Sequence, residues 1–143
     1  MPDLSSHEIA LHRLNDSPEI RVLIVDDSRS LRRVLKRELS RIGIMSTDTA
    51  QNGLAAIQAL RRETFDLMLL EIEMPMLDGI NVLKIVKEDP KLQHIPIIII
   101  SGFDYCEQSM VCMQLGAEYY LPKPFNVMML RTQIFSAIAK TRR

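Results

Sequence analysis

The chain has 143 residues, of which 47% are hydrophobic, and its 18 basic and 18 acidic side chains give a formal net charge of zero. This is enough apolar sequence for one globular domain with a single core, and the even charge balance argues against disorder and against direct binding of nucleic acid. The sequence has no apolar stretch of membrane-spanning length and no secretion signal, so we expect no membrane span and a cytoplasmic location.

Residues 1–19 are mostly polar and are interpreted as a tail or a short helix lying on the body, followed by one domain over residues 20–141. Cys106 and Cys112 lack the C-x-x-C spacing of redox or zinc sites, so we expect reduced thiols. The three histidines are scattered, without the i, i+4 spacing that suits a metal.

From residue 20 onward, short apolar runs alternate with amphipathic segments. This alternation is typical of a parallel sheet covered by helices on both faces. The predicted strands are 22–25, 44–49, 65–70, 95–100 and 118–121. The predicted helices are 28–42, 52–62, 80–88, 104–115 and 126–138. Five such units with right-handed crossovers give an α/β, flavodoxin-like, doubly wound sheet of five strands in the order 2-1-3-4-5, with five helices.

Several local patterns refine this prediction. The second strand is more polar than the others, which fits a sheet edge. Gly43 and Gly116 are expected to end helices in the left-handed conformation. Three helices have apolar positions at helical spacing that should face inward. In the helix over 28–42 these are Leu31, Val34, Leu35, Leu39 and Ile42. In the helix over 52–62 they are Leu54, Ile57 and Leu60, and in the last helix they are Val127, Leu130, Ile134 and Ile138.

The residues that follow the strands carry the chemistry. Ligands of such sheets bind at the carboxyl ends of the strands, and those positions hold Asp26, Asp27, Glu71, Ser101 and Lys123. Converging carboxylates repel one another unless a cation lies among them, and a few hard oxygen ligands suit Mg²⁺. A lysine and a hydroxyl facing that ion could hold a phosphoryl group while a carboxylate accepts it. Taken singly, each residue has an ordinary explanation, since aspartates cap helices and Lys-Pro forms turns.

At this point the chain resembles the receiver domains of response regulators, over residues 21 to about 139. The matching segments are Val-Leu-Ile-Val-Asp-Asp-Ser (22–28), Asp-Leu-Met-Leu-Leu-Glu-Ile-Glu-Met-Pro-Met-Leu-Asp-Gly (66–79), Ile-Pro-Ile-Ile-Ile-Ile-Ser-Gly (95–102) and Leu-Gly-Ala-Glu-Tyr-Tyr-Leu-Pro-Lys-Pro-Phe (115–125). The resemblance implies a module of two-component phosphorelay signalling whose site binds Mg²⁺.

The resemblance also implies roles for individual residues. Asp26 and Asp27 would form the acidic pair, with Asp27 as the direct metal ligand, and the main-chain carbonyl of Glu73 would be a further ligand. Ser101 would be the switch hydroxyl and Tyr120 the switch aromatic. Lys123 would bind phosphate, before a cis peptide to Pro124. The side chain of Glu73 is expected to face solvent, and Tyr120 could alternatively be a plain core aromatic.

Glu71 departs from the family pattern, in which an aspartate accepts phosphate from a histidine kinase. Its extra methylene moves the carboxylate outward by roughly 1 to 1.5 Å, which makes normal phosphorylation doubtful and could weaken Mg²⁺ binding. Two interpretations compete. Glu71 could imitate a phosphorylated aspartate, or it could pair with Lys123 and leave a silent module that signals by binding alone. Residual phosphotransfer is a third.

Two kinds of partner are expected. The first is a histidine kinase or phosphotransfer protein, and the second is an effector or a second receiver, which could be another copy of this chain in a homodimer. The second kind would dock on the face of helix 104–115, strand 118–121 and helix 126–138, because Ser101 and Tyr120 would couple the site to it. Four methionines fall in those helices, and the default interpretation of each is core packing. They are Met110, Met113, Met128 and Met129. No output domain follows in this sequence, as in a single-domain regulator or a piece of a longer chain.

Two other functions are weighed against this one. A Mg²⁺-dependent phosphotransferase or phosphatase could use the same carboxylates on an external substrate, but the loops are too short for a substrate lid, so we expect a binding module and not an enzyme. A nucleotide-binding domain is excluded because neither glycine-rich phosphate-binding motif occurs.

Overall fold

The structure is a computed structural model that describes residues 19–102 and 105–141. The predicted tail, apart from Glu19, lies outside the described residues, as do His7, His12 and the predicted start of a helix at residue 104. None of the described helices is of a length and hydropathy that would let it cross a membrane.

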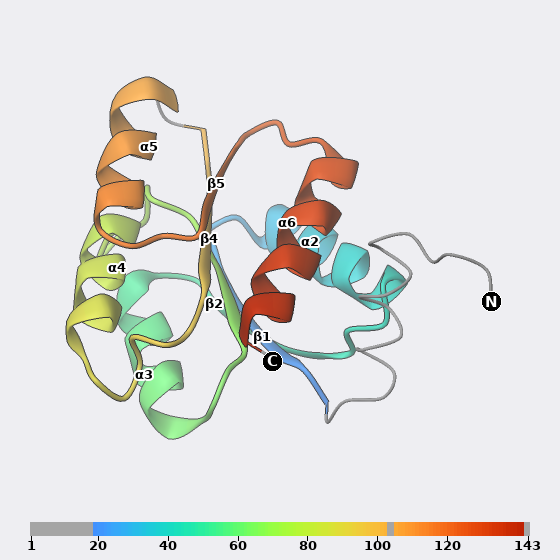
Figure 1. The fold of residues 1–143 in the computed structure, drawn as a ribbon, viewed down its shortest axis with the longest axis horizontal. Helices are drawn as coiled ribbons and strands as arrows, with labels where there is room; N and C mark the ends of the chain where they lie inside the picture. Colours follow the sequence, from blue (N-terminus) through green and yellow to red (C-terminus); the bar gives the residue numbers. More distant parts are fainter. Residues whose placement is uncertain (1–18, 103–104, 142–143) are drawn as a thin grey trace.

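Five parallel strands form one sheet in the order β2-β1-β3-β4-β5, as predicted. The strands are β1 (Arg21–Val25), β2 (Ser46–Ala50), β3 (Leu67–Leu70), β4 (Ile97–Ser101) and β5 (Tyr119–Pro122). The described helices are α2 (Arg29–Arg41), α3 (Gly53–Arg62), α4 (Gly79–Glu88), α5 (Tyr105–Gln114) and α6 (Val127–Thr141). Helices α3, α4 and α5 cover one face of the sheet, and α2 and α6 cover the other (Figure 1).

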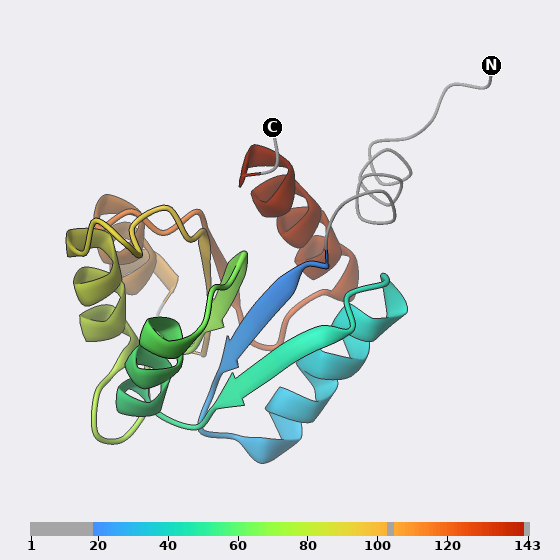
Figure 2. The same ribbon diagram turned by 90° about the horizontal axis from the view of Figure 1, so that it is seen from below.

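The core consists of two apolar layers, one on each face of the sheet. Successive residues of β1 alternate between them: Leu23 and Val25 pack in the layer under α3 and α4, whereas Val22 and Ile24 pack in the layer under α2 and α6. Because both faces are covered, a central strand needs apolar residues at every position, which explains the continuous run. The more polar β2 is at the sheet edge beside β1 (Figure 2).

Polar side chains cap the start of two helices, and the two glycines predicted to end helices do so. The Ser28 side chain accepts a hydrogen bond from the Leu31 main-chain N–H at 3.2 Å, and Asn52 does the same for Ala55 at 2.8 Å. Gly43 and Gly116 have φ of 91° and 106°, the left-handed conformation that glycine adopts without steric cost.

Three predictions about burial and boundaries are wrong. Leu54 and Val127 are exposed, because they lie in the first turns of α3 and α6, where the apolar spacing continues beyond the core. Strands β2, β3 and β4 begin two residues later than predicted, since Ile44, Phe65 and Ile95 are buried without belonging to a strand. The default of core packing also fails for four methionines, all of them exposed on α5 and α6: Met110, Met113, Met128 and Met129.

Cys112 gives a first testable prediction. Its side chain is fully buried, and burial raises the pKa of its thiol to about 11. The thiolate is the reactive form, so in a Cys106→Ser background Cys112 should react with a thiol reagent at pH 8 only as fast as the protein unfolds. Because the folded pKa lies above the unfolded value, this thiol's contribution to stability is present below about pH 9 and is lost as the pH rises through 11. Labelling at the rate of a free thiol under native conditions would contradict the burial.

Candidate functional site

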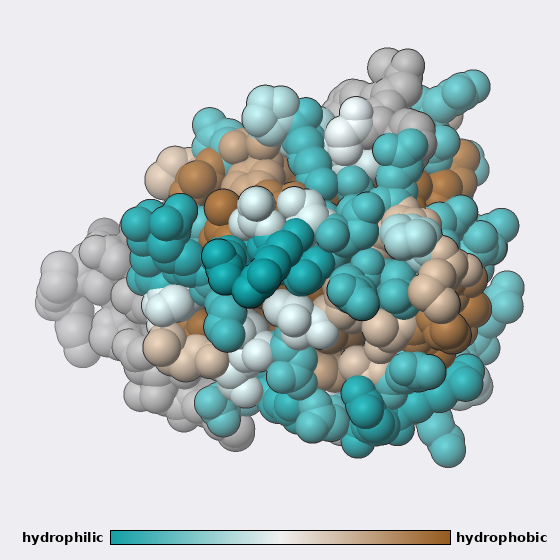
Figure 3. Space-filling model, turned by 180° about the vertical axis from the view of Figure 1, so that it is seen from behind, coloured by the Kyte–Doolittle hydropathy of each residue, from teal (hydrophilic) through white to brown (hydrophobic). Residues whose placement is uncertain are grey.

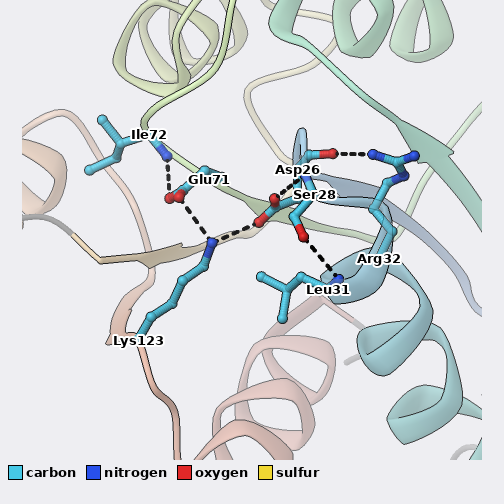
Figure 4. A network of polar contacts seen from close by, with 7 residues as sticks. All are labelled: Asp26, Ser28, Leu31, Arg32, Glu71, Ile72 and Lys123. Atoms are coloured by element: carbon cyan, nitrogen blue, oxygen red, sulfur yellow. Dashed lines mark hydrogen bonds and ion pairs between the residues drawn. The ribbon is translucent and has the colours of Figure 1, made fainter.

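The predicted site residues gather at the carboxyl ends of the strands. Asp26 follows β1, Glu71 follows β3 and Lys123 follows β5. The Lys123 Nζ atom lies 3.0 Å from Asp26 Oδ2 and 3.0 Å from Glu71 Oε1, so one ammonium bridges the two carboxylates (Figure 4). Three residues far apart in sequence therefore meet at one point because parallel strands end at the same edge.

The remaining carboxylate oxygens are also hydrogen-bonded. Asp26 Oδ1 accepts from the main-chain N–H of Ser28 at 2.8 Å, and Glu71 Oε2 accepts from that of Ile72 at 2.8 Å. Asp26 is 1% exposed and Glu71 is 7% exposed, and buried carboxylates require such partners. The cluster is thus a satisfied network of two carboxylates, one ammonium and two main-chain donors.

The two neighbouring carboxylates affect the pKa of the Lys123 ammonium. Its partial burial acts to lower the pKa of the ammonium, but hydrogen bonds and attraction to Glu71 and Asp26 outweigh that effect, and the net pKa is raised. The lysine therefore stays charged at neutral pH and serves as the counterion of both acids. The peptide bond from Lys123 to Pro124 is cis, in agreement with the prediction.

The other predicted site residues lie around this network. Ser101 is the buried last residue of β4, and Tyr120 is buried in the neighbouring strand β5. Asp27 and Glu73 are exposed and do not take part in the Lys123 network. The structure thus brings together Asp26, Glu71 and Lys123.

The arrangement of the acidic side chains bears on the binding of Mg²⁺. Over residues 19–102 and 105–141, no three His, Cys, Asp or Glu side chains are grouped as metal ligands. Between Asp26 and Glu71, where a cation would be held, the structure has the Lys123 ammonium. The residues in this arrangement do not fit a divalent ion, and Mg²⁺ bound by Asp26, Asp27, Glu71 and Glu73 stays a prediction.

Two supporting residues were missed by the sequence analysis. The Arg32 Nη1 atom donates to the main-chain carbonyl of Asp26 at 2.7 Å, which ties α2 to the end of β1. Gly79 donates its N–H to the carbonyl of Ile72 at 2.8 Å, and a Cβ atom at this position would collide with the carbonyl oxygen of Glu71. The Asp-Gly pair at 78–79 indicated only a turn, and the sequence has no signal for a contact between backbones.

The chain belongs to the response regulator receiver domain family, whose family model matches residues 22–135. It is therefore a receiver domain of the two-component response regulators. Among similar proteins, chemotaxis protein CheY-3 of Vibrio cholerae is 33% identical over 115 residues, covering 80% of this chain and 88% of that protein. The chemotaxis protein CheY of Pseudomonas aeruginosa is 31% identical over 115 residues, covering 80% and 93%.

Solved structures agree with this assignment. The receiver domain of Francisella response regulator 1452 has a TM-score of 0.78 at 29% identity, covering 85% of this chain and 98% of that chain. These relatives are signalling proteins, and receiver domains generally bind Mg²⁺ at the acceptor site. In longer relatives the similarity covers one part only: for the DNA-binding transcriptional regulator NtrC of Escherichia coli it covers 22% of the protein, at 38% identity.

Proposed function

We propose that this receiver domain signals by binding, without an aspartyl phosphate, because Glu71 stands where the family has its phosphate-accepting aspartate. The observation that carries the proposal is the engagement of both Glu71 oxygens. Oε1 pairs with Lys123 at 3.0 Å and Oε2 accepts from the Ile72 N–H at 2.8 Å. The ammonium that would hold an incoming phosphoryl group is already neutralised by the acceptor side chain.

Geometry argues further against normal phosphotransfer. The carboxylate of glutamate lies roughly 1 to 1.5 Å farther from the backbone than that of aspartate, about one C–C bond. In-line attack on a phosphodonor tolerates such a displacement poorly, with losses on the order of 100-fold. The Glu71 carboxylate contacts Lys123, so the residue that impairs the reaction also occupies the ammonium that would bind phosphate.

The charge of the Glu71–Lys123 pair favours a fixed conformation of the site over full imitation of an aspartyl phosphate. A phosphoryl group carries about −1.5 to −2 charges and three outer oxygens, whereas a glutamate carries one charge and two oxygens. In this site the Lys123 ammonium is shared between Glu71 and Asp26. We therefore favour a constitutive conformation fixed by the ion pair, with a histidine kinase or phosphotransfer protein binding without transfer of phosphate.

The proposal is tested by incubation with Mg²⁺ and a small phosphodonor such as acetyl phosphate, followed by intact mass measurement. The wild-type chain should show no phosphate adduct. A Glu71→Asp variant should acquire one phosphoryl group, at a rate on the order of 100-fold above any residual rate of the wild type. The Glu71→Gln variant is the matched control, since it keeps the length of the side chain but cannot accept phosphate. A stable adduct on wild-type Glu71 would refute the proposal, and turnover of an external phosphoester would favour the enzyme hypothesis instead.

The surface of α5, β5 and α6 supports the second half of the proposal. Six apolar side chains on the two helices are exposed: Met110, Val111, Met113, Val127, Met128 and Met129. Contiguous exposed apolar surface on a domain often marks contacts with partners, and flexible methionines adapt to different partners. We propose that an effector or a second receiver docks on this surface. In a homodimer, each copy would use this same surface.

Substitution on this face gives a further prediction. Met113→Glu should leave the free energy of unfolding unchanged within about 0.5 kcal/mol, because the side chain is exposed, yet should weaken any self-association through this face. Sedimentation over a range of concentrations measures the association, with Met45→Glu as the control, an exposed methionine outside this face. If Glu71→Gln associates as the wild type does, the charge of Glu71 does not set the state of the face.

A further inference from the structure

The charge of the chain is balanced overall but not locally. Helix α2 contains six basic residues and one acid. The acid, Glu38, is buried and bound by Arg41 at 3.0 Å and by Arg131 at 3.1 Å. The solvent-facing side of α2 therefore carries cations only, and a hydrophilic band lies over it in the view from behind (Figure 3).

The spacing of these cations is unfavourable for an isolated helix. They are Arg29, Arg32, Arg33, Lys36 and Arg37, which are neighbours three or four positions apart. Like charges at this spacing destabilise a helix, and α2 has no exposed acid to offset them. The described part of the chain gives none of these five an ion pair. An external anion would relieve the repulsion.

The same residues surround a hollow. A surface cavity of about 210 Å³ is lined by Arg29, Arg32, Arg33, Lys36 and, from β2, Thr49. Every lining side chain is a hydrogen-bond donor, and none is acidic. A larger cavity of about 510 Å³ at the other end of the sheet differs, since its basic lining residues are interspersed with Glu63 and Asp89. The lining of the hollow on α2 is thus basic without any acid, which favours an anion.

We propose that this hollow binds a short chain of phosphate groups, either inorganic triphosphate or the phosphate tail of a nucleotide. Four cations lining one small space call for a compact anion with several charges, which a single carboxylate cannot provide. Guanidinium groups pair with phosphate oxygens through two parallel hydrogen bonds. The volume equals about seven water molecules at ≈ 30 Å³ each, which is room for phosphate groups but not for a nucleoside as well. The nucleoside would project into solvent and contribute little.

The hollow shares no residue with the Lys123 network, but one hydrogen bond links the two. Arg32 lines the hollow and also donates to the Asp26 carbonyl at 2.7 Å. The inference does not depend on whether Glu71 accepts phosphate, because no residue of the Lys123 network lines the hollow.

Isothermal titration of the full chain, in low salt and without Mg²⁺, tests the proposal with orthophosphate, inorganic triphosphate and ATP. Triphosphate and ATP should bind within about threefold of each other and at least tenfold more tightly than orthophosphate, with an affinity that falls as salt is added. Lys36→Glu should weaken triphosphate binding at least tenfold. The matched control is Lys84→Glu, an exposed lysine on α4 on the opposite face of the sheet, which should leave binding unchanged.

Two results would overturn the proposal. Equal weakening by Lys36→Glu and Lys84→Glu would reduce the effect to general charge, as would triphosphate that binds no better than orthophosphate. Co-sedimentation with vesicles of 80% phosphatidylcholine and 20% phosphatidylserine separates the remaining source of phosphate. Capture by vesicles without any titration signal for triphosphate or ATP would assign the cations to a lipid surface instead. Circular dichroism of each variant confirms that it is folded.

Discussion

Replacement of Lys123 by Met should lower the free energy of unfolding by about 3 kcal/mol, the lower end of the range for a buried charge that loses its partner. Lys123 compensates two carboxylates that are 1% and 7% exposed, and its own side chain is 25% exposed, which places the effect at that lower end. Urea unfolding should show a lower midpoint at an unchanged slope.

A double variant separates charge compensation from packing. In Lys123→Met with Glu71→Gln, only Asp26 remains as an uncompensated acid, so part of the loss should be regained. Lys84→Met removes an exposed lysine for which no ion pair is described and should change stability by less than about 0.5 kcal/mol. Equal midpoints for Lys123→Met and the wild type would mean that the ammonium does not balance the two acids.

The Lys123→Met variant also tests whether the Lys123 ammonium occupies the place of a divalent cation between Asp26 and Glu71. With the ammonium removed, Asp26 and Glu71 would be free to take an external ion, and Mg²⁺ should then raise the unfolding midpoint of Lys123→Met more than that of the wild type. The difference follows from competition between the ammonium and a divalent ion for the same oxygens. An equal shift in both proteins would show that the ion binds elsewhere and that Lys123 does not exclude it.

The fold was predictable because its signals are local and repeated. The apolar runs identified the buried strands, and Gly43 and Gly116 marked helix ends through the chemistry of a single residue type. Burial was less predictable where a helix extends past the core. Periodicity places Leu54 and Val127 on the apolar faces of their helices, but it contains no information on where the sheet beneath those helices ends.

The sequence predicted which residues form the candidate site but not how their side chains contact one another. Strand-end positions gave Asp26, Glu71 and Lys123, because parallel strands must bring these positions to one edge. The exposure of Asp27 and the sharing of one ammonium by two acids depend on side-chain directions that spacing does not encode. The contact of Gly79 with Glu71 depends on two backbone segments in three dimensions, and it leads to the second large effect.

Gly79→Ala should lower the free energy of unfolding by about 3 kcal/mol, the upper end of the usual range for overpacking. The added Cβ would collide with the carbonyl oxygen of Glu71, and Glu71 cannot retreat without cost because its N–H donates to the Val25 carbonyl of the adjacent strand at 2.9 Å. Helix propensity predicts the opposite sign, since Gly79 is the first residue of α4 and Ala is favoured over Gly by up to about 1 kcal/mol within helices.

Gly102→Ala provides the control, because a Cβ there would lie 4.0 Å from the Cβ of Lys123, an ordinary contact distance at the rim of the same site. Its free energy of unfolding, measured in urea, should stay within about 0.5 kcal/mol of that of the wild type. Should Gly79→Ala prove as stable as the wild type, the packing of α4 against the end of β3 would not fix the main chain of Glu71. The direction of that carboxylate toward Lys123 would then depend on the ion pair alone, and the Lys123→Met variant should release it.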